Sequence, residues 1–257
     1  MQALADSAPS PEELRLLAGG EPLLSLTNLR AGYGRMEILH GIDLAVAPGR
    51  SLCLIGPNGA GKSTVLHSIY GFTRILEGTV RVAGEDVTRT SPNQKLRSGV
   101  AYVLQDNSVF PDMTVEENLW MGGYLMARPQ QAKEAAERVF ARYKRLADRR
   151  RQPARVLSGG ERRLLEISRA LVMDPKILLV DEPSIGLEPR YIDMVFEILT
   201  ALQREEGKSI VMVEQNAKKG LEFADVGYVL VAGNVARAAT GRELLEDPEV
   251  GRLFLGG

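Results

Sequence analysis

The stretch "SLCLIGPNGAGKST", residues 51–64, decides the fold of this chain. Its first part, "SLCLI", is an apolar run without polar alternation, which is typical of a short strand buried on both faces. A glycine-rich loop follows, and a helix is expected over residues 62–70. The loop matches G-x-x-x-x-G-K-[ST], and a strand before it and a helix after it are the context that this phosphate-binding motif requires. The stretch therefore predicts a nucleotide-binding domain.

The residue types in this loop explain how it would hold phosphate. Glycines let consecutive backbone N–H groups surround a β-phosphate, and the start of the following helix adds positive potential. The amine of Lys62 can reach the β- and γ-phosphates, and the hydroxyl of Ser63 can ligate Mg²⁺. The nucleotide-binding residues expected here are Gly56, Pro57, Asn58, Gly59, Ala60, Gly61, Lys62, Ser63 and Thr64.

The composition is that of an ordinary globular protein, with 257 residues, 44% apolar, 25% charged and a formal net charge of −1. This charge gives no overall electrostatic footprint for nucleic acid. The single cysteine, Cys53, excludes an internal disulfide and fits a reducing compartment. Residues 1–20 lack the basic start and apolar run of a signal peptide, and no apolar run approaches the roughly 20 residues that span a bilayer. We therefore expect another chain to supply any membrane-spanning part.

Strand-like and helix-like segments alternate along the chain, which indicates an α/β domain with a mainly parallel sheet. Residues 1–20 are expected to form an extension, loosely ordered or with a short helix near 12–18. Residues 114–150 have a helical pattern and suggest a helical insert. A terminal hairpin is expected to turn on Gly233 and Asn234. The other expected strands cover residues 23–29, 37–46, 99–105, 176–182 and 209–215, and further helices cover 160–173 and 191–207.

Two adjacent carboxylates end the apolar segment "KILLVDEP", residues 176–183. Burying Asp181 and Glu182 without partners would be costly, so a metal ion and a water molecule are the simplest explanation for them. Adjacent strand residues point to opposite sides, and the two can therefore have different roles. Asp181 can hold Mg²⁺, and Glu182 can polarise an attacking water as a general base.

The segment "LSGGE", residues 157–161, separates the families that share the phosphate loop. It lies between that loop and "ILLVDE", and in this order the motifs resemble those of the ATP-binding cassette (ABC) ATPases. Gln105 ends "AYVLQ" where the family has its Q-loop glutamine, and "SIGLEP", residues 184–189, occupies the D-loop position. Tyr33 in "AGYG" lies where an aromatic ring stacks on adenine. The resemblance covers residues 22–257.

This resemblance implies a P-loop NTPase fold with a RecA-like parallel-sheet core, an antiparallel β subdomain and a helical subdomain at about 106–156, all within a domain covering residues 21–257. It implies ATP and Mg²⁺ as cofactors, with Ser63, Gln105 and Asp181 as metal ligands. It also implies a head-to-tail dimer in which the signature motif contacts the ATP of the other subunit. The signature residues are Leu157, Ser158, Gly159, Gly160 and Glu161.

The strand end "SIVMVEQNAKKG", residues 209–220, departs from the general family pattern. ABC ATPases usually carry a histidine at the position of Gln215, and the histidines of this chain are His40 and His67. An amide can donate to a phosphate oxygen and accept from water, but it does not take up a proton near neutral pH. We therefore expect Gln215 to be a neutral γ-phosphate sensor and Glu182 the base. The simpler alternative is a strand-end amide that bonds to backbone.

Local phrases narrow the resemblance further. "FPDMTVEENLWMG", "VMVEQNA" and "YVLVAGNVARAATGRELLEDPEV" resemble the shorter ATPase subunit of branched-chain amino acid importers. The implied partners are a second ATPase subunit, identical or related, two transmembrane permease subunits and an extracytoplasmic substrate-binding protein, and the chain would lie on the cytoplasmic face of the membrane. Import of urea, amides or other small polar solutes remains an alternative. A soluble non-transport ABC ATPase and a small-molecule kinase, which has no need of "LSGGE", are weaker ones.

Overall fold

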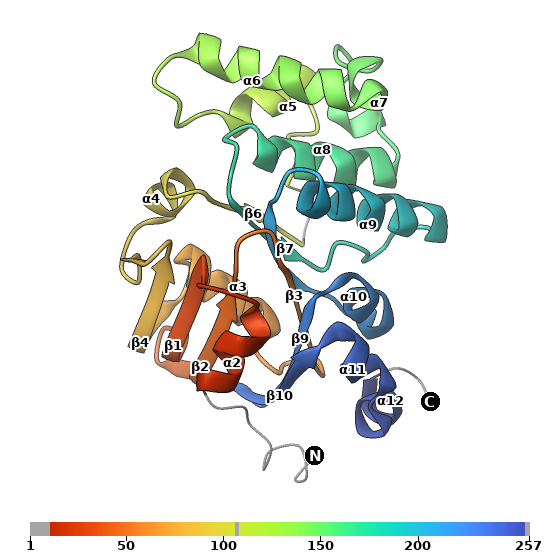
Figure 1. Cartoon of the computed structure of the whole chain (residues 1–257). Helices are drawn as coiled ribbons and strands as arrows, with labels where there is room; N and C mark the ends of the chain where they lie inside the picture. Colours follow the sequence, from red (N-terminus) through yellow and green to blue (C-terminus); the bar gives the residue numbers. More distant parts are fainter. Residues whose placement is uncertain (1–10, 106–107, 255–257) are drawn as a thin grey trace.

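A mostly parallel sheet forms the centre of the computed structural model, which describes residues 11–105 and 108–254 (Figure 1). Its strand order is β10-β9-β3-β8-β7-β6, and all neighbours are parallel except β10 and β9. Every residue of β3, β7 and β8 is buried, as expected for apolar runs covered on both faces. The strands are β3 (Ser51–Ile55), β6 (Val100–Val103), β7 (Ile177–Asp181), β8 (Ser209–Val213), β9 (Val226–Val231) and β10 (Asn234–Thr240).

Side chains alternate between two hydrophobic cores, one on each face of this sheet. Leu52 and Leu54 belong to the core shared with helix α3 (Lys62–Tyr70) and the antiparallel sheet. Cys53 and Ile55 face the opposite core, which is covered by the helices at the C-terminal side. These helices are α9 (Pro189–Arg204), α10 (Ala217–Phe223), α11 (Gly241–Glu246) and α12 (Pro248–Phe254).

The antiparallel sheet has the order β2-β1-β4-β5 and packs on the first core. Helix α2 (Pro11–Ala18) lies beside it and buries Leu14 and Ala18. Residues 1–10 of the expected N-terminal extension lie outside the described residues. The sequence pattern predicted two of these strands and missed the other two. The strands are β1 (Leu24–Tyr33), β2 (Met36–Val46), β4 (Arg74–Val82) and β5 (Glu85–Asp86).

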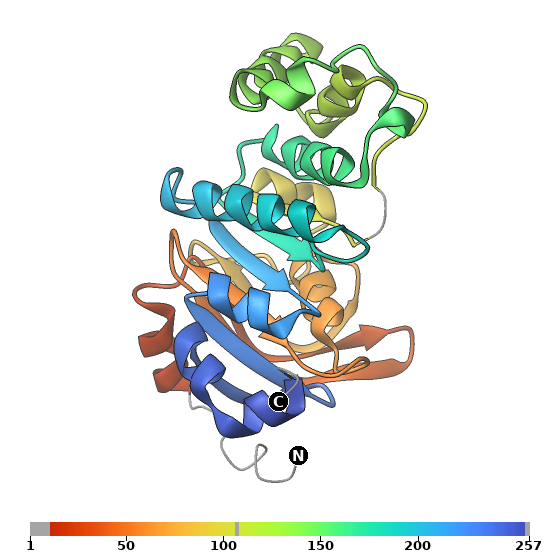
Figure 2. The same cartoon turned by 90° about the vertical axis from the view of Figure 1, so that its right-hand side faces the viewer.

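The expected helical insert has a hydrophobic core of its own. Figures 1 and 2 show α5, α6 and α7 gathered at one end of the molecule, far from α11 and α12. Helix α8 joins this core through Leu164 and Leu165. Capping boxes on Thr114 and Ser158 start α5 and α8. The elements of the insert are α5 (Val115–Gly122), α6 (Pro129–Arg142), α7 (Lys144–Ala147) and the 3₁₀ turn η1 (Ala154–Val156), and α8 (Gly159–Leu171) follows them. Helix α4 (Pro92–Arg97) lies outside the insert, and its Leu96 belongs to the second core of the parallel sheet. None of the helices within 11–105 and 108–254 is long and apolar enough to cross a membrane.

Candidate functional site

The glycine-rich loop joins β3 to α3 as the sequence predicted, and its geometry requires glycine. Gly56, Gly59 and Gly61 all have positive φ angles, of 149°, 78° and 97°. A Cβ atom at Gly56 would lie 2.2 Å from the carbonyl oxygen of Leu230. The loop can therefore curl over the end of β3 only with glycine at these positions.

Lys62 is buried at the first position of α3. Its Nζ donates to the carbonyl oxygens of Gly56 at 2.9 Å and of Pro57 at 3.1 Å. Burial lowers the pKa of this amine below its ordinary value. The two hydrogen bonds hold the ammonium group against the loop. A phosphate bound in the loop would therefore be attracted by the positive charge of Lys62.

Two hydroxyl groups converge on Asp181 at the end of β7. Ser63 Oγ donates to Asp181 Oδ1 at 3.0 Å, and the Tyr102 hydroxyl donates to Oδ2 at 2.9 Å. Asp181 is only 3% exposed, so these hydrogen bonds compensate for its burial. The structure thus brings together Ser63 and Asp181, two of the three expected metal ligands, and adds Tyr102, which sequence reasoning had missed.

Glu182 follows Asp181 in an uncommon backbone conformation. Its φ is +43°, and its N–H donates to the carbonyl oxygen of Val213 on the neighbouring strand at 2.9 Å. Its Oε2 accepts from Nε2 of Gln105 at 3.0 Å. Burial, and then the charge of Asp181, raises the pKa of Glu182. A raised pKa and a strained backbone are common features of a reacting group.

One cleft of about 410 Å³ collects most of the predicted catalytic and phosphate-binding residues. Gln215 is exposed and lines it, together with Ile185 from the D-loop segment. The other lining residues are Asn58, Gly59, Gly61, Lys62, Ser63, Thr64, Gln105 and Glu182. The cleft therefore joins the phosphate loop, the expected base and the expected γ-phosphate sensor.

Tyr33 lies apart from this cleft, at the end of β1. Its hydroxyl contacts Nδ1 of His67 on α3, and the two rings meet edge to face. The tyrosine is 43% exposed, so one side of it is open to solvent. Its expected role of stacking on adenine stays a prediction.

The signature residues occupy a different place in the chain. Ser158 Oγ accepts from the N–H of Glu161 at 3.3 Å, and Glu161 Oε2 accepts from the N–H of Ser158 at 3.0 Å, which closes the capping box of α8. Both line a second cavity, of about 420 Å³, beside Arg149 and Tyr191. Gly160 packs so closely that a Cβ there would lie 2.1 Å from Tyr191 Cδ1. Within this chain, the signature motif therefore does not face the phosphate loop.

A buried ion pair on α8 is the other feature that sequence reasoning missed. Arg163 and Glu166 are each 5% exposed, and Arg163 Nη1 lies 2.8 Å from Glu166 Oε2. The guanidinium also donates to the carbonyl oxygens of Leu104 and Asp181, and Glu166 Oε1 accepts from the N–H of Ser108. The pair thus ties both sides of the Q-loop to the end of β7. The sequence signal that could have indicated this pair is the presence of two charged residues on the buried side of the amphipathic helix α8.

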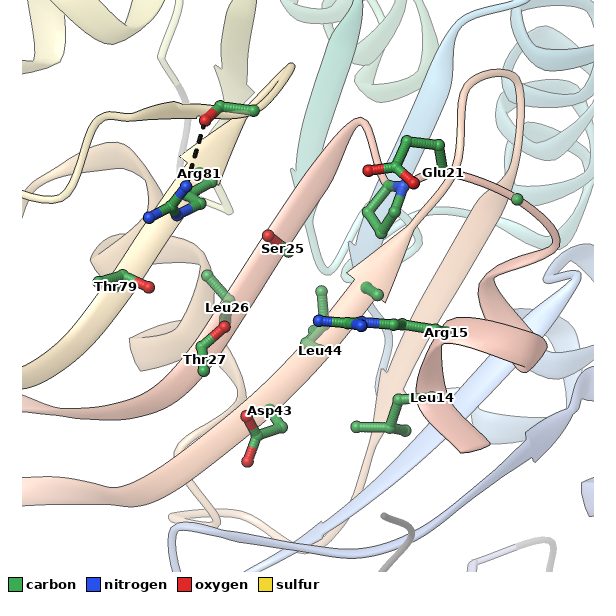
Figure 3. Close-up of a pocket in the computed structure, with 14 residues that line it drawn as sticks. Leu14, Arg15, Glu21, Ser25, Leu26, Thr27, Asp43, Leu44, Thr79 and Arg81 are labelled. Carbon is green, nitrogen blue, oxygen red and sulfur yellow. Dashed lines mark hydrogen bonds between the residues drawn. The ribbon is translucent and has the colours of Figure 1, made fainter. Parts of the chain in front are cut away.

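A hollow larger than the phosphate-loop cleft contains none of the predicted site residues. Figure 3 shows it between α2 and the outer face of the antiparallel sheet, with Arg15 lying across Leu44. Its volume is about 570 Å³, and Ser25, Thr27, Thr79 and Arg81 also line it. Size alone therefore does not identify the functional site of this chain.

Known proteins resemble this chain in sequence and fold. The family model described as ABC transporter matches residues 39–185. The high-affinity branched-chain amino acid transport ATP-binding protein BraG of Pseudomonas aeruginosa is 40% identical over 91% of this chain and 100% of that protein. The probable branched-chain amino acid transport ATP-binding protein LivF of Archaeoglobus fulgidus is 34% identical over 91% of this chain and 99% of that protein.

A crystal structure described as the ADP conformation of an ATP-binding cassette of an ABC transporter has a TM-score of 0.81. Its sequence is 28% identical, over 92% of this chain and all of that chain. This likeness confirms the ABC ATPase fold expected from the motifs. The matched family model and the near full-length relatives show that the chain belongs to the ABC transporter family, as one of its ATP-binding proteins.

Proposed function

We propose that this chain is the ATP-hydrolysing subunit of an importer for branched-chain or related amino acids. The observation that carries the ATPase role is the single cleft shared by Lys62, Glu182 and Gln215. The import of branched-chain amino acids rests on the relatives, two of which are transport ATP-binding proteins for these solutes. The ATPase need not contact the solute, so its own residues identify the chemistry of ATP better than that of the cargo.

The described residues fit Mg²⁺ at the phosphate loop. A hydroxyl oxygen from Ser63 and a carboxylate oxygen from Asp181 are 3.0 Å apart, and oxygen atoms of this kind are the ligands that Mg²⁺ prefers. Gln105 would contribute an amide oxygen. When bound, the ion would neutralise charge on the phosphates.

The residues of the cleft have separate tasks in hydrolysis. Lys62 holds the β- and γ-phosphates, because its ammonium group is already fixed at the loop. Glu182 accepts a proton from the attacking water, and its raised pKa makes it a better base. Gln215 donates from its amide to a γ-phosphate oxygen and orients the water.

The signature motif acts on the ATP of a second ATPase subunit. Ser158 and the N-terminus of α8, a helix of 13 residues, present a hydroxyl and backbone N–H groups suited to a phosphate oxygen. They line a cavity separate from the cleft of their own chain. A head-to-tail pair of subunits, identical or related, accounts for this separation.

A groove between the core and the helical insert is the proposed contact with a permease. It has a volume of about 340 Å³ and is lined mainly by apolar and aromatic side chains. Phe110, Met121 and Tyr124 are exposed there, although each is large and mostly apolar. A short amphipathic segment of a permease subunit would cover them. The chain would then lie on the cytoplasmic face of the membrane, and a substrate-binding protein would lie on the other side of the membrane.

Isolation from membranes through a tag on this chain tests the proposal. We expect two permease subunits and a second ATPase to copurify, and ATP hydrolysis to rise when the substrate-binding protein and leucine, isoleucine or valine are added. The variant Lys62→Met is the matched control, because it should assemble but not hydrolyse ATP. If urea or amides stimulated hydrolysis and these amino acids did not, the transported solute would belong to the alternative class. Purification without any permease would contradict the transport role.

A further inference from the structure

Glu214, at the carboxyl end of β8, is buried beside the cleft and has no role among the motifs described above. Its exposed fraction is 1%, whereas the next residue, Gln215, is exposed and lines the cleft. An ionised carboxylate loses much hydration when it is buried, so hydrogen-bond donors must replace the water.

Three neutral donors surround the Glu214 carboxylate. Oε1 accepts from Ser184 Oγ at 2.7 Å and from the N–H of Asn216 at 2.8 Å. Oε2 accepts from the N–H of Ser184 at 3.3 Å. Helix capping does not explain the residue, because the side chain of Asn216 caps α10 by accepting from the N–H of Lys219 at 3.1 Å.

These donors belong to two segments that reach the cleft. Ser184 immediately precedes Ile185, which lines the cleft, and Asn216 immediately follows Gln215. The same junction also holds Glu182, whose carbonyl oxygen accepts from the N–H of Ile185 at 3.2 Å. The Glu214 carboxylate is thus the point where the D-loop segment and the strand end carrying Gln215 are joined.

The stem of Glu214 has little freedom to move. Helix α10 passes so close that a Cβ on Gly220 would lie 3.1 Å from Glu214 Cβ and 2.7 Å from Cys53 Sγ. Glycine at this position allows the close approach, and the packed stem keeps the carboxylate facing Ser184. The arrangement resembles the supporting contacts that preorganise a reacting site.

We propose that Glu214 is a positioning residue for ATP hydrolysis, which fixes the D-loop segment and Gln215 in one geometry through Ser184 and Asn216. This inference rests on the proposed ATPase function. Glu214 does not touch the reacting atoms; it acts through Asn216, the residue after Gln215, and through Ser184, the residue before Ile185.

The variant Glu214→Gln tests the carboxylate with almost no change in shape. Glutamine replaces one acceptor oxygen by an NH₂ group, which must face a backbone N–H, either that of Ser184 or that of Asn216. One donor therefore loses its acceptor in either orientation. We expect kcat to fall about tenfold while KM for ATP stays within about twofold, because the phosphate loop is untouched.

The kinetic experiment uses the complex isolated through this chain. Ser184→Ala should lower kcat less than Glu214→Gln, and the two changes together should cost less than the product of their single effects, because they remove parts of one contact. Glu222→Gln, an exposed residue on the neighbouring helix α10, is the control for the loss of one carboxylate. A wild-type kcat in Glu214→Gln, a rise in KM alone, or fully multiplicative effects would overturn the inference.

Amide hydrogen exchange of the isolated full chain tests the geometry independently of activity. Glu214→Gln should speed exchange in segments 183–187 and 215–217 and leave α6 unchanged. Unchanged exchange in those segments, or equally faster exchange everywhere, would also overturn the inference. Failure of the proposed function would look different, because wild type would then hydrolyse no more ATP than Lys62→Met.

Discussion

Lys95 is fully buried on α4, with an exposed fraction of 0%, and it anchors the helix that begins at the phosphate loop. Its Nζ donates to the carbonyl oxygens of Ile69 at 2.7 Å and Ser68 at 3.4 Å, near the C-terminal end of α3. Burial lowers the pKa of this amine from its ordinary value near 10.5 to about 8, although the charge of Asp86 opposes the shift. Lys95 should therefore make stability depend on pH in an uncommon direction.

The sign follows from counting protons. Between about pH 8 and 10.5 the unfolded chain keeps the Lys95 proton that the folded chain has released, so this residue makes the folded state more stable as pH rises. Each pH unit in this range contributes about 1.4 kcal/mol. From pH 7 to pH 9.5 the lysine should therefore add about 2 kcal/mol to the free energy of unfolding.

Urea unfolding of wild type and Lys95→Met at the two pH values isolates this contribution, because the other titrating groups cancel in the difference. We expect the stability of wild type relative to Lys95→Met to rise by about 2 kcal/mol between pH 7 and 9.5. The exposed Lys218→Met is the matched control for loss of one lysine. If the difference between wild type and Lys95→Met stayed constant, or fell with pH, the buried amine would not have the lowered pKa argued above.

Four further outcomes are expected. Glu182→Gln should still bind ATP in a nucleotide titration but slow its turnover by roughly 10²–10⁴-fold, and wild-type turnover would remove Glu182 from the mechanism. Gln215→Ala in the assembled complex should hydrolyse ATP more slowly than wild type, and an equal rate would leave only the strand-end alternative. The chain alone should hydrolyse ATP poorly until a second ATPase subunit is added, whereas full activity of a strict monomer would exclude the head-to-tail dimer. Arg163→Met should lower the free energy of unfolding, measured with urea, by about 3–5 kcal/mol, because it leaves the buried Glu166 charge unpaired. The double variant Arg163→Met/Glu166→Leu should lose clearly less, because no unpaired buried charge remains. Equal losses in the two variants would contradict this reasoning.

Local sequence predicted the elements whose geometry is set within a few residues. The phosphate loop and α3 have the expected bounds, because Gly61 and Lys62 define where the loop ends and the helix begins. The terminal hairpin formed as expected, but its turn lies one residue earlier. Ala232 and Gly233 have φ angles of +46° and +76°, and Asn234 already begins β10. A two-residue turn with both φ angles positive fits the twist of the paired strands.

Elements and contacts that depend on distant partners were harder to predict. Strand β4 contains Gly78 and several charged residues, so its pattern is not typical of a strand; it forms because β1 pairs with it from almost 50 residues away. The contacts of Glu214 likewise depend on a residue that is distant in the sequence. Its sequence neighbours show a polar strand end, but the donor side chain of Ser184 comes from 30 residues earlier. Motifs locate the residues proposed to contact ATP, whereas only the folded structure reveals the residues that hold them in place.

Gln105 illustrates how these supporting contacts constrain the mechanism. As a Mg²⁺ ligand it would use its amide oxygen, whereas the structure engages its Nε2, which donates to Glu182 at 3.0 Å. The two roles are compatible, because the oxygen and nitrogen of one amide are different atoms and can serve different partners. The hydrogen bond orients Glu182, the proposed base, and it also uses one acceptor site on the carboxylate oxygen Oε2. In the proposed mechanism, Oε1 is therefore the oxygen more open to the attacking water, because it accepts no hydrogen bond from Gln105. Arg163 holds Leu104, the residue before Gln105, through its carbonyl oxygen, so a movement that frees Oε2 would have to turn the Gln105 side chain while Leu104 stays in place.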